Sequence, residues 1–297
     1  MLVDVVRFGR RGRQILASTG DPGVTIAEFL EEERFSKDFA HFYLMPMVSA
    51  IWSSGTELVA DYPRDPLLRF LDNHGLLQIT GQPSWRTVVG GSHSYIAPLT
   101  RPLDDRVHLG KGVERIHRSS DEIELVLDDG SRHGFDHVVI AAHADQALRI
   151  LAEPTKDEAE LLGKWSYSLN ETWLHTDTKL MPRRRAAWAS WNYLMSNASQ
   201  ENASLTYHLN RLQGLDEKCE YLVSLNPETE PVPESVIRQM SYRHPIYTRQ
   251  SVETQRELSR INGRNRTHFC GAYFGNGFHE DGLASAVAVA DDLGVVF

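Results

Sequence analysis

The stretch Phe269–Leu293 reads FCGAYFGNGFHEDGLASAVAVADDL and joins a short apolar strand, a glycine-rich turn and an alanine-rich helix. Glycines let the backbone of such a turn approach a ligand closely. The helix that follows starts with unpaired N–H groups and the positive end of its dipole, which together stabilise a phosphate or another electron-rich edge. Glu280 and Asp281 also fit simple helix capping, so spacing alone leaves both a ligand site and a structural turn open.

Upstream of this stretch, residues 107–151 have the pattern of sheet strands followed by a helix. Residues 122–127 alternate with the strand period and end at Asp128-Asp129-Gly130, a hairpin turn signal. Val138–Ala142 is a continuous apolar run, typical of a strand that is buried on both faces, and a short helix is predicted at 144–151. Further strands are predicted at 88–92, 107–109 and 113–117.

The rest of the chain divides into helices and a second group of strands. Helical periodicity covers residues 4–16, 25–34, 35–53 and 66–77, with a capping box at Thr25 and Glu28 and an interruption at Pro46. Four strand candidates, at 173–180, 186–194, 204–212 and 221–227, are separated by polar loops and predict an antiparallel sheet. Residues 228–260 are rich in proline and charge, which indicates connections with a polar helix at 252–260.

The composition excludes several classes of protein. A formal net charge of −9 over 297 residues argues against a general nucleic-acid binder, which needs clustered Lys and Arg to contact phosphates. The run Arg183–Arg185 fits a solvated loop better than an anion site. No segment approaches the ~20 apolar residues of a transmembrane helix. With only Cys219 and Cys270 and no HExxH motif, we expect a cytoplasmic protein without disulfides or a metal site.

Several segments resemble the FAD-dependent amine oxidase and phytoene desaturase superfamily. The tail, 269–293, is similar to that family's closing strand, glycine turn and flavin-contacting helix. VVGGSHSYIAPL at 88–99 is similar to its GG-segment, and residues 107–151 to the second segment of its FAD domain. More narrowly, NHGLLQITGQPSWRTVVGGS, MPRRRAAWASWNY, TYHLNRLQ and CGAYFGNGFHEDG resemble a bacterial branch described as predicted NAD/FAD-binding proteins.

The resemblance implies FAD as the cofactor and names residues that contact it. Val113 matches a valine that meets the adenine through its backbone. The cofactor-binding positions that the resemblance implies in the tail are Gly271, Gly277, Phe278, His279, Glu280, Asp281, Gly282 and Leu283. His279 fits contact with the cofactor edge and simple capping equally well. Tyr273 stands where many amine oxidases carry a glutamate and Ala286 where the closing helix often has glycine, and no residue is singled out as a catalytic base.

The resemblance also implies a mixed α/β fold with a discontinuous layout. Residues 85–150 and 262–297 are assigned to a Rossmann-like FAD-binding domain, 1–84 to the helical part of a substrate domain, and 151–261 to the antiparallel sheet of that domain. An FAD domain of this kind begins with a strand, a GxGxxG turn and a helix that hold the pyrophosphate. Because no GxGxxG turn follows a strand in these 297 residues, we expect an incomplete, truncated FAD domain.

The function that the resemblance implies is a flavin-dependent oxidation, in which a hydride passes from a small-molecule substrate to FAD. The apolar, aromatic and methionine-rich stretch 42–52 favours a lipid-like substrate over a small polar amine, although it is also typical of a packed helix. The alternative is a non-catalytic fragment or interaction module that holds no FAD. A serine hydrolase is disfavoured because Ser92 lies outside any GxSxG motif.

Overall fold

The computed structural model describes residues 1–18, 23–53, 59–78, 80–81, 84, 86–194 and 204–295. The chain forms two compact units, which we call unit 1 (Met1–Pro102 and Ser168–His244) and unit 2 (Leu103–Tyr167 and Pro245–Phe297). Helices and strands occur in both units, so the predicted mixed α/β fold with an antiparallel sheet is confirmed. Trp85, the predicted start of an FAD-domain segment, lies outside the described residues, as do residues 296–297.

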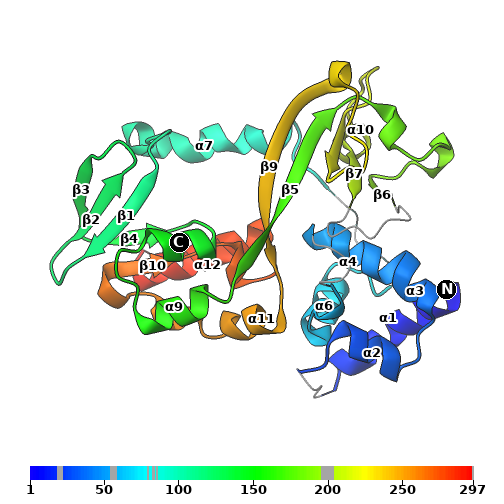
Figure 1. The fold of residues 1–297 in the computed structure, drawn as a ribbon, viewed down its shortest axis with the longest axis horizontal. Helices are drawn as coiled ribbons and strands as arrows, with labels where there is room; N and C mark the ends of the chain where they lie inside the picture. The colour runs from blue at the N-terminus through cyan, green and yellow to red at the C-terminus, as the bar shows by residue number, and fades with distance from the viewer. Residues whose placement is uncertain are drawn as a thin grey trace. The chain divides into compact units, whose positions relative to one another are not determined.

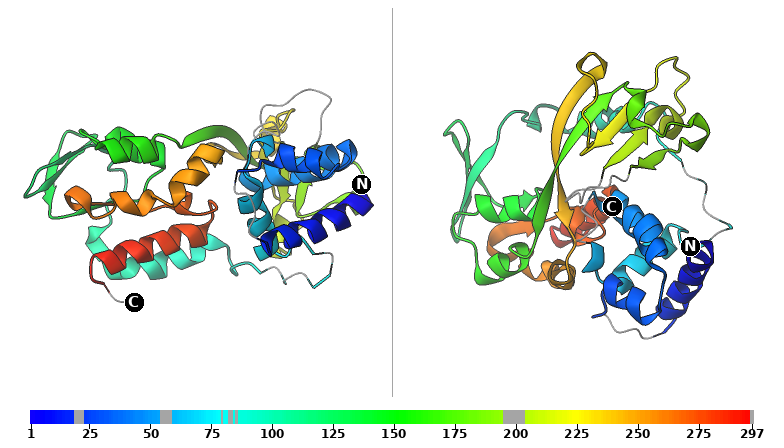
Figure 2. Two further views of the ribbon diagram at one scale, coloured as in Figure 1. Left: turned by 90° about the horizontal axis from the view of Figure 1, so that it is seen from below. Right: turned by 45° about the vertical axis from the view of Figure 1, so that its right-hand side comes forward.

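The first part of unit 1 is a group of helices, drawn in blue to cyan in Figures 1 and 2. These are α1 (Leu2–Leu16), α2 (Ile26–Glu32), α3 (Lys37–Phe39), the π-helix η1 (Ala40–Leu44), α4 (Met45–Trp52) and α6 (Arg64–Asn73). Phe8, Phe29 and Phe39 are buried together, with the ring centroids of Phe8 and Phe39 5.4 Å apart. The predicted capping box is confirmed, since the Glu28 amide donates to the Thr25 hydroxyl at 3.2 Å and the Thr25 amide to the Glu28 carboxylate at 2.8 Å.

The predicted interruption at Pro46 lies before this residue rather than at it. Pro46 falls in the first turn of α4, where the missing N–H of proline breaks no helical hydrogen bond. The irregular part is η1, which precedes it with π-helical hydrogen bonds. The helix then ends at Ser53, whose backbone has the left-handed conformation with a φ of 51°.

The second part of unit 1 is a five-stranded sheet in the order β6-β7-β8-β5-β9. The strands are β5 (Ser166–His175), β6 (Trp191–Tyr193), β7 (Leu205–His208), β8 (Leu222–Leu225) and β9 (Val236–Ile246), with the short helix α10 (Leu209–Gln213) after β7. The pairs β6–β7, β7–β8 and β8–β5 are antiparallel, as the sequence predicts. Three buried side chains join these strands, because the Ser224 hydroxyl lies 2.8 Å from His175 Nε2 and 2.7 Å from the Thr206 hydroxyl.

Strand β9 lies in a region that the sequence assigns to connections, and that prediction is wrong. The strand contains Pro245 and no residue classed as buried, so it lacks the apolar alternation by which a half-buried strand is identified. Its place at the edge of the sheet explains why proline is tolerated there, since one side of an edge strand needs no ladder partner. The polar helix predicted at 252–260 is α11 (Arg249–Gln255), followed by the 3-10 helix η7 (Leu258–Ile261).

Unit 2 contains an antiparallel sheet, a parallel strand pair and several helices (Figure 1). The antiparallel sheet is β1 (Val113–Arg118), β2 (Ile123–Leu127) and β3 (Arg132–Phe135), and the parallel pair is β4 (Val138–Ile140) with β10 (Thr267–Phe269). The helices are α8 (Ala144–Ile150), α9 (Lys156–Leu162), α11 and α12 (His279–Asp292). The predicted hairpin turn is confirmed, with Gly130 at a φ of 80°.

Two strand predictions in this part of the chain are wrong. Residues 88–92 form a turn because Gly90 and Gly91 both have positive φ, of 81° and 77°, which an extended strand does not allow. Residues 107–109 are irregular, and Leu109 is exposed. The described residues also form the short helices η2 (Ser92–Tyr95), α7 (Ile96–Thr100), η3 (Arg101–Arg106), η4 (Thr178–Leu180), η5 (Arg185–Ala187), η6 (Pro233–Ser235), η8 (Arg264–Arg266) and η9 (Ala272–Phe274).

Candidate functional site

The predicted site in the tail is a turn in unit 2 that connects β10 to α12. The Gly271 amide donates to the hydroxyl of Ser285, in α12, at 2.9 Å, and this hydroxyl also lies 3.3 Å from the Gly271 carbonyl. The amides of Gly275 and Gly277 both donate to the Ala272 carbonyl at 3.1 Å. The turn is therefore closed on itself and fixed to the helix that follows it.

Two glycines of this turn are required by their surroundings. A Cβ at Gly275 would lie 2.1 Å from the Asp281 carboxylate, and a Cβ at Gly277 would lie 2.7 Å from the Tyr247 hydroxyl. Gly277 also has a φ of 93°, which side-chain-bearing residues rarely adopt. The sequence identifies these glycines as points of close approach, and here the neighbours that approach are other parts of unit 2.

Helix α12 begins at His279, four residues earlier than the sequence predicts. The Asp281 carboxylate accepts a hydrogen bond of 3.0 Å from the Phe278 amide, and the Gly282 amide donates to the Phe278 carbonyl at 3.2 Å. The first N–H groups of a helix have no helical acceptor, and the dipole makes this end positive. The side chains of Phe278, His279, Glu280 and Leu283 are exposed around it. This end of α12 therefore presents N–H groups that suit an electron-rich edge, with Asp281 as the cap and the Glu280 carboxylate in the same turn.

An aromatic cluster packs behind the turn. The ring centroid of Trp165 lies 5.4 Å from that of Tyr247 and 5.8 Å from that of Tyr273, and all three side chains are buried. Burial raises the pKa of Tyr273 far above its usual range, and its hydroxyl has no hydrogen-bond partner within the described part of the chain. Burial also raises the pKa of the Cys270 thiol, which disfavours the thiolate that a nucleophile needs.

Sequence reasoning missed Trp165, Tyr247 and Gln255, all of which belong to this site. The Gln255 side-chain amide, in α11, donates to the carbonyls of Tyr273 and Gly275, and the Tyr247 hydroxyl donates to the Gly275 carbonyl at 3.1 Å. None of the three belongs to a motif. They precede Phe269 by 14 residues or more and lie outside its glycine motif, so no local pattern could have associated them with it.

Val113, the other predicted cofactor contact, and the strand that opens the tail belong to different sheets. Val113 opens β1, where it pairs with Leu127 of β2, whereas β10 pairs with β4 in a different sheet. Both positions belong to unit 2. The structure thus brings the predicted glycines and the start of α12 together in one turn, and it places Val113 on a separate strand.

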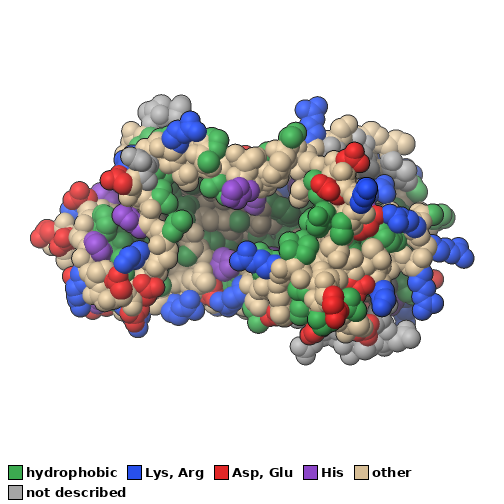
Figure 3. All heavy atoms as spheres, turned by 90° about the horizontal axis from the view of Figure 1, so that it is seen from above, with side chains coloured by type: hydrophobic (Ala, Val, Ile, Leu, Met, Phe, Trp, Pro, Cys, Tyr) green, Lys and Arg blue, Asp and Glu red, His purple; other side chains and the backbone are tan. Residues whose placement is uncertain are grey.

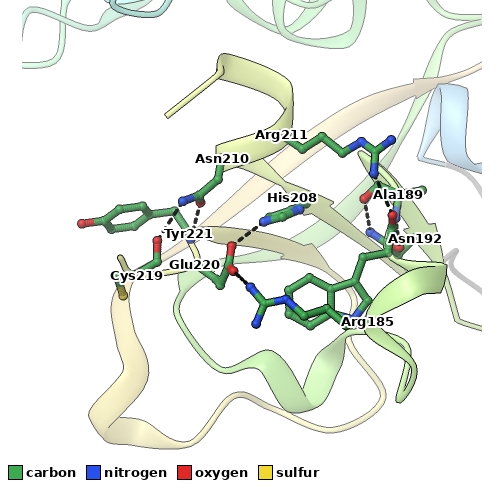
Figure 4. Close-up of polar contacts among 10 residues, drawn as sticks. Arg185, Ala189, Asn192, His208, Asn210, Arg211, Cys219, Glu220 and Tyr221 are labelled. Atoms are coloured by element: carbon green, nitrogen blue, oxygen red, sulfur yellow. Dashed lines mark hydrogen bonds and ion pairs between the residues drawn. The ribbon is translucent and has the colours of Figure 1, made fainter. Parts of the chain in front are cut away.

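The arginine run in unit 1 takes part in a structural network (Figure 4). Arg185 pairs with the Glu220 carboxylate, and its guanidinium lies 4.8 Å from the centroid of the Trp188 ring. Glu220 also lies 2.7 Å from Nε2 of His208 in β7. These contacts fix the loop around Arg185 to the sheet. On the face that Figure 3 shows, Lys and Arg lie among Asp and Glu side chains.

Within the ranges that the structure describes, no three His, Cys, Asp or Glu side chains come close enough to hold a metal ion. Across these same ranges, every helix is too short or too polar to span a bilayer.

Comparisons with known proteins show both a sequence family and a fold. The family model for flavin containing amine oxidoreductases matches residues 18–215, two thirds of the chain. This range stops before the tail, so the model itself does not cover the turn and α12. No curated protein sequence matches the chain.

Solved structures with similar folds include enzymes with different named substrates. A CLA-producing fatty acid isomerase from P. acnes has a TM-score of 0.68 at 13% identity, and the alignment covers 99% of this chain and 74% of that one. Wild-type putrescine oxidase bound to putrescine gives a TM-score of 0.66 at 13% identity, over 98% and 75% of the two chains. Cyclohexylamine oxidase from Brevibacterium oxydans gives 0.61 at 12% identity, over 99% and 75%.

Proposed function

The chain belongs to the flavin containing amine oxidoreductase family, which implies FAD as the cofactor, and we propose that it is an FAD-dependent oxidoreductase whose closing turn and α12 contact the flavin. The observation that carries this proposal is the start of α12, an exposed positive helix end held behind a turn in which glycine cannot be replaced without a clash. When bound, the flavin accepts a hydride from a carbon of the substrate.

The residues of the turn fit a flavin in two respects. Gly271 and Gly277 let the turn pack tightly against Tyr273 and Tyr247, and the N–H groups of residues 279–281, which have no helical acceptor, lie directly after this turn, where they suit the edge of a flat ring. The side chains around this end, Phe278 and Leu283, are exposed and apolar, which suits the edge of an aromatic ring system. Asp281 keeps the Phe278 amide paired and thereby fixes where the helix starts.

Val113 fits a role at the adenine end of the cofactor. We assign its backbone to the adenine contact, because it opens β1 in the same unit as the turn. The FAD-domain segments then fall mainly in unit 2, and the helices and the five-stranded sheet of unit 1 supply the substrate domain. We also propose a cytoplasmic location; both cysteines are free thiols.

We propose a lipid-like substrate, supported by a part of the stretch 42–52. Leu44, Val48 and Trp52 are buried in unit 1 and act as core, whereas Phe42 is 57% exposed. The fatty acid isomerase shows that this fold accommodates an enzyme named for a lipid, while the two amine oxidases show that it also accommodates enzymes named for amines. Following the bleaching of bound flavin under anaerobic conditions separates these classes. Reduction by putrescine or cyclohexylamine but not by unsaturated fatty acids or polyenes would refute the lipid-like assignment.

The flavin site itself is tested by moving one negative charge along α12. A Cβ at Gly282 meets only an ordinary contact of 3.7 Å, so Gly282→Asp fits sterically but places a carboxylate at the helix start. We expect FAD to bind about fivefold more weakly, since a charge in the first turn is worth about 1 kcal/mol. Ala288→Asp, at an exposed position in the third turn of the same helix, is the matched control and leaves the affinity unchanged. Equal affinities for both variants, measured by flavin absorbance and fluorescence, would place the cofactor elsewhere.

A further inference from the structure

The carbonyl groups of the glycine turn are held by side chains from outside the tail. Gln255, at the end of α11, donates two side-chain amide hydrogen bonds to this turn, one to the Tyr273 carbonyl at 3.1 Å and one to the Gly275 carbonyl. The Tyr247 hydroxyl donates a third bond, also to the Gly275 carbonyl, at 3.1 Å. Two carbonyls of the turn therefore depend on two side chains that precede the tail in sequence.

These bonds hold the segment that directly precedes α12. The Gly277 amide is bonded to Ala272, so residues 272–277 move together, and Phe278 follows directly as the residue before α12. The space on the Tyr247 side is full, because the hydroxyl that bonds Gly275 is also the atom that a Cβ at Gly277 would meet. A shift of the Gly275 carbonyl would thus displace the first N–H groups of the helix.

We infer that Gln255 is a positioning residue, which holds the glycine turn so that the first N–H groups of α12 face the flavin with a fixed geometry. This inference rests on the proposed function. Gln255 has two donor hydrogens on one planar amide, which match two carbonyl oxygens of a tight turn. A carboxylate of the same shape has only acceptors when ionised and would repel both carbonyls, whereas a protonated carboxyl group restores one donor.

The experiment compares Gln255→Glu with the wild-type chain at about pH 8 and about pH 5, since an ordinary glutamate titrates near 4.3 and unfavourable acceptors raise its pKa. At the higher pH we expect faster amide hydrogen exchange in the peptide 271–282 and FAD binding weaker by about tenfold, equivalent to one or two lost hydrogen bonds. At the lower pH both properties return toward wild-type values. Gln250→Glu, on the exposed side of α11, is the matched control and shows no such pH profile.

Tyr247→Phe provides a second variant that keeps the ring contact with Trp165 and removes only the hydroxyl. We expect Tyr247→Phe to speed amide exchange in the peptide 271–282 and to weaken FAD binding by less than Gln255→Glu does, and to do so equally at both pH values. Unchanged exchange in Gln255→Glu at the higher pH would overturn the inference outright. Faster exchange with unchanged FAD affinity would overturn the positioning role while the proposed function stands. A wild-type chain that binds no FAD would instead refute the proposed function, and the exchange data would then report on the turn alone.

Discussion

Gly277 shows how one missing side chain shapes the site. Its φ of 93° and the Tyr247 hydroxyl 2.7 Å from the position of a Cβ predict that Gly277→Ala is destabilised twice, by backbone strain and by a clash. We expect the free energy of unfolding to fall by about 2–3 kcal/mol, since the left-handed conformation alone costs about 1–2 kcal/mol for a residue with a side chain. Urea unfolding measures this change.

Gly214→Ala is the control for that substitution. Gly214 has a similar left-handed backbone, with a φ of 65°, but a Cβ there meets nothing within 4 Å. Gly214→Ala should therefore lower the free energy of unfolding only by the backbone strain, about 1–2 kcal/mol. Equal losses for the two glycines would show that the Tyr247 hydroxyl imposes no constraint on the turn.

A second prediction at the residue scale concerns the ion pair between Arg118 and Glu158. Arg118 Nη1 lies 2.6 Å from the Glu158 carboxylate, and their side chains are only 6% and 1% exposed. Burial alone would raise the pKa of Glu158, but the Arg118 guanidinium and the Thr155 amide outweigh it and hold the pKa below its usual range. A carboxyl group whose pKa is lowered by folding stabilises the protein above its unfolded pKa and loses this contribution as the pH falls through the folded pKa.

We therefore expect the wild-type free energy of unfolding to decrease as the pH falls below about 4.3, and the decrease to be smaller in Glu158→Gln. At neutral pH, Arg118→Ala should cost about 3–5 kcal/mol, because it leaves a buried carboxylate without its partner. Denaturant unfolding across the pH range measures both. The same pH dependence in wild type and Glu158→Gln would exclude this pair as its source.

At the scale of elements, strand β10 has an edge closed by one side chain. The side-chain oxygen of Asn262 accepts a hydrogen bond from the Phe269 backbone N–H at 2.7 Å, and the side-chain nitrogen donates to the Phe269 backbone carbonyl at 3.2 Å. The side chain thus takes the place of a neighbouring strand. Asn262→Ala should cost about 1–3 kcal/mol, since two buried backbone groups lose their partner. At a pH low enough to protonate the new carboxyl group, Asn262→Asp keeps both an acceptor and a donor and should lose less. Hydrogen exchange at the Phe269 amide reports the opening of this edge. Equal exchange rates in Asn262→Ala and wild type would show that Asn262 does not close the edge.

The elements differ in how well the sequence predicts them. The hairpin of β2 and β3 and the capped helix α2 are confirmed, because a turn signal and a capping box act within a few residues. Strand β9 is missed because its pattern reflects its place at the edge of the sheet, which the local sequence does not encode. The turn at Gly90 is wrongly predicted as a strand, because the two valines before it favour a strand while the sequence alone does not show that Gly90 and Gly91 have positive φ.

At the scale of the molecule, the two units predict two unfolding transitions. Leu71 is fully buried in unit 1 and Arg118 belongs to unit 2, so Leu71→Ala and Arg118→Ala should each lower the midpoint of a different transition in calorimetry. Leu71→Ala should cost about 2–5 kcal/mol, as expected for a large side chain removed from a core. FAD at a hundredfold excess over its Kd should stabilise only the transition that Arg118→Ala lowers, by about 2.7 kcal/mol. A single transition shifted by both variants would show that the units unfold together.

The sequence by itself determined the family, the mixed α/β class and the position of the glycine turn before α12, because these follow from motifs and periodicities contained in short stretches. Only the tertiary structure revealed that Gln255, Tyr247 and Trp165 hold and line that turn. Trp165 precedes the tail by about a hundred residues, so its contact with Tyr273 leaves no trace in any local pattern. The sequence thus placed the turn, whereas the tertiary structure supplied the side chains from outside the tail that pack against it and bond its carbonyls.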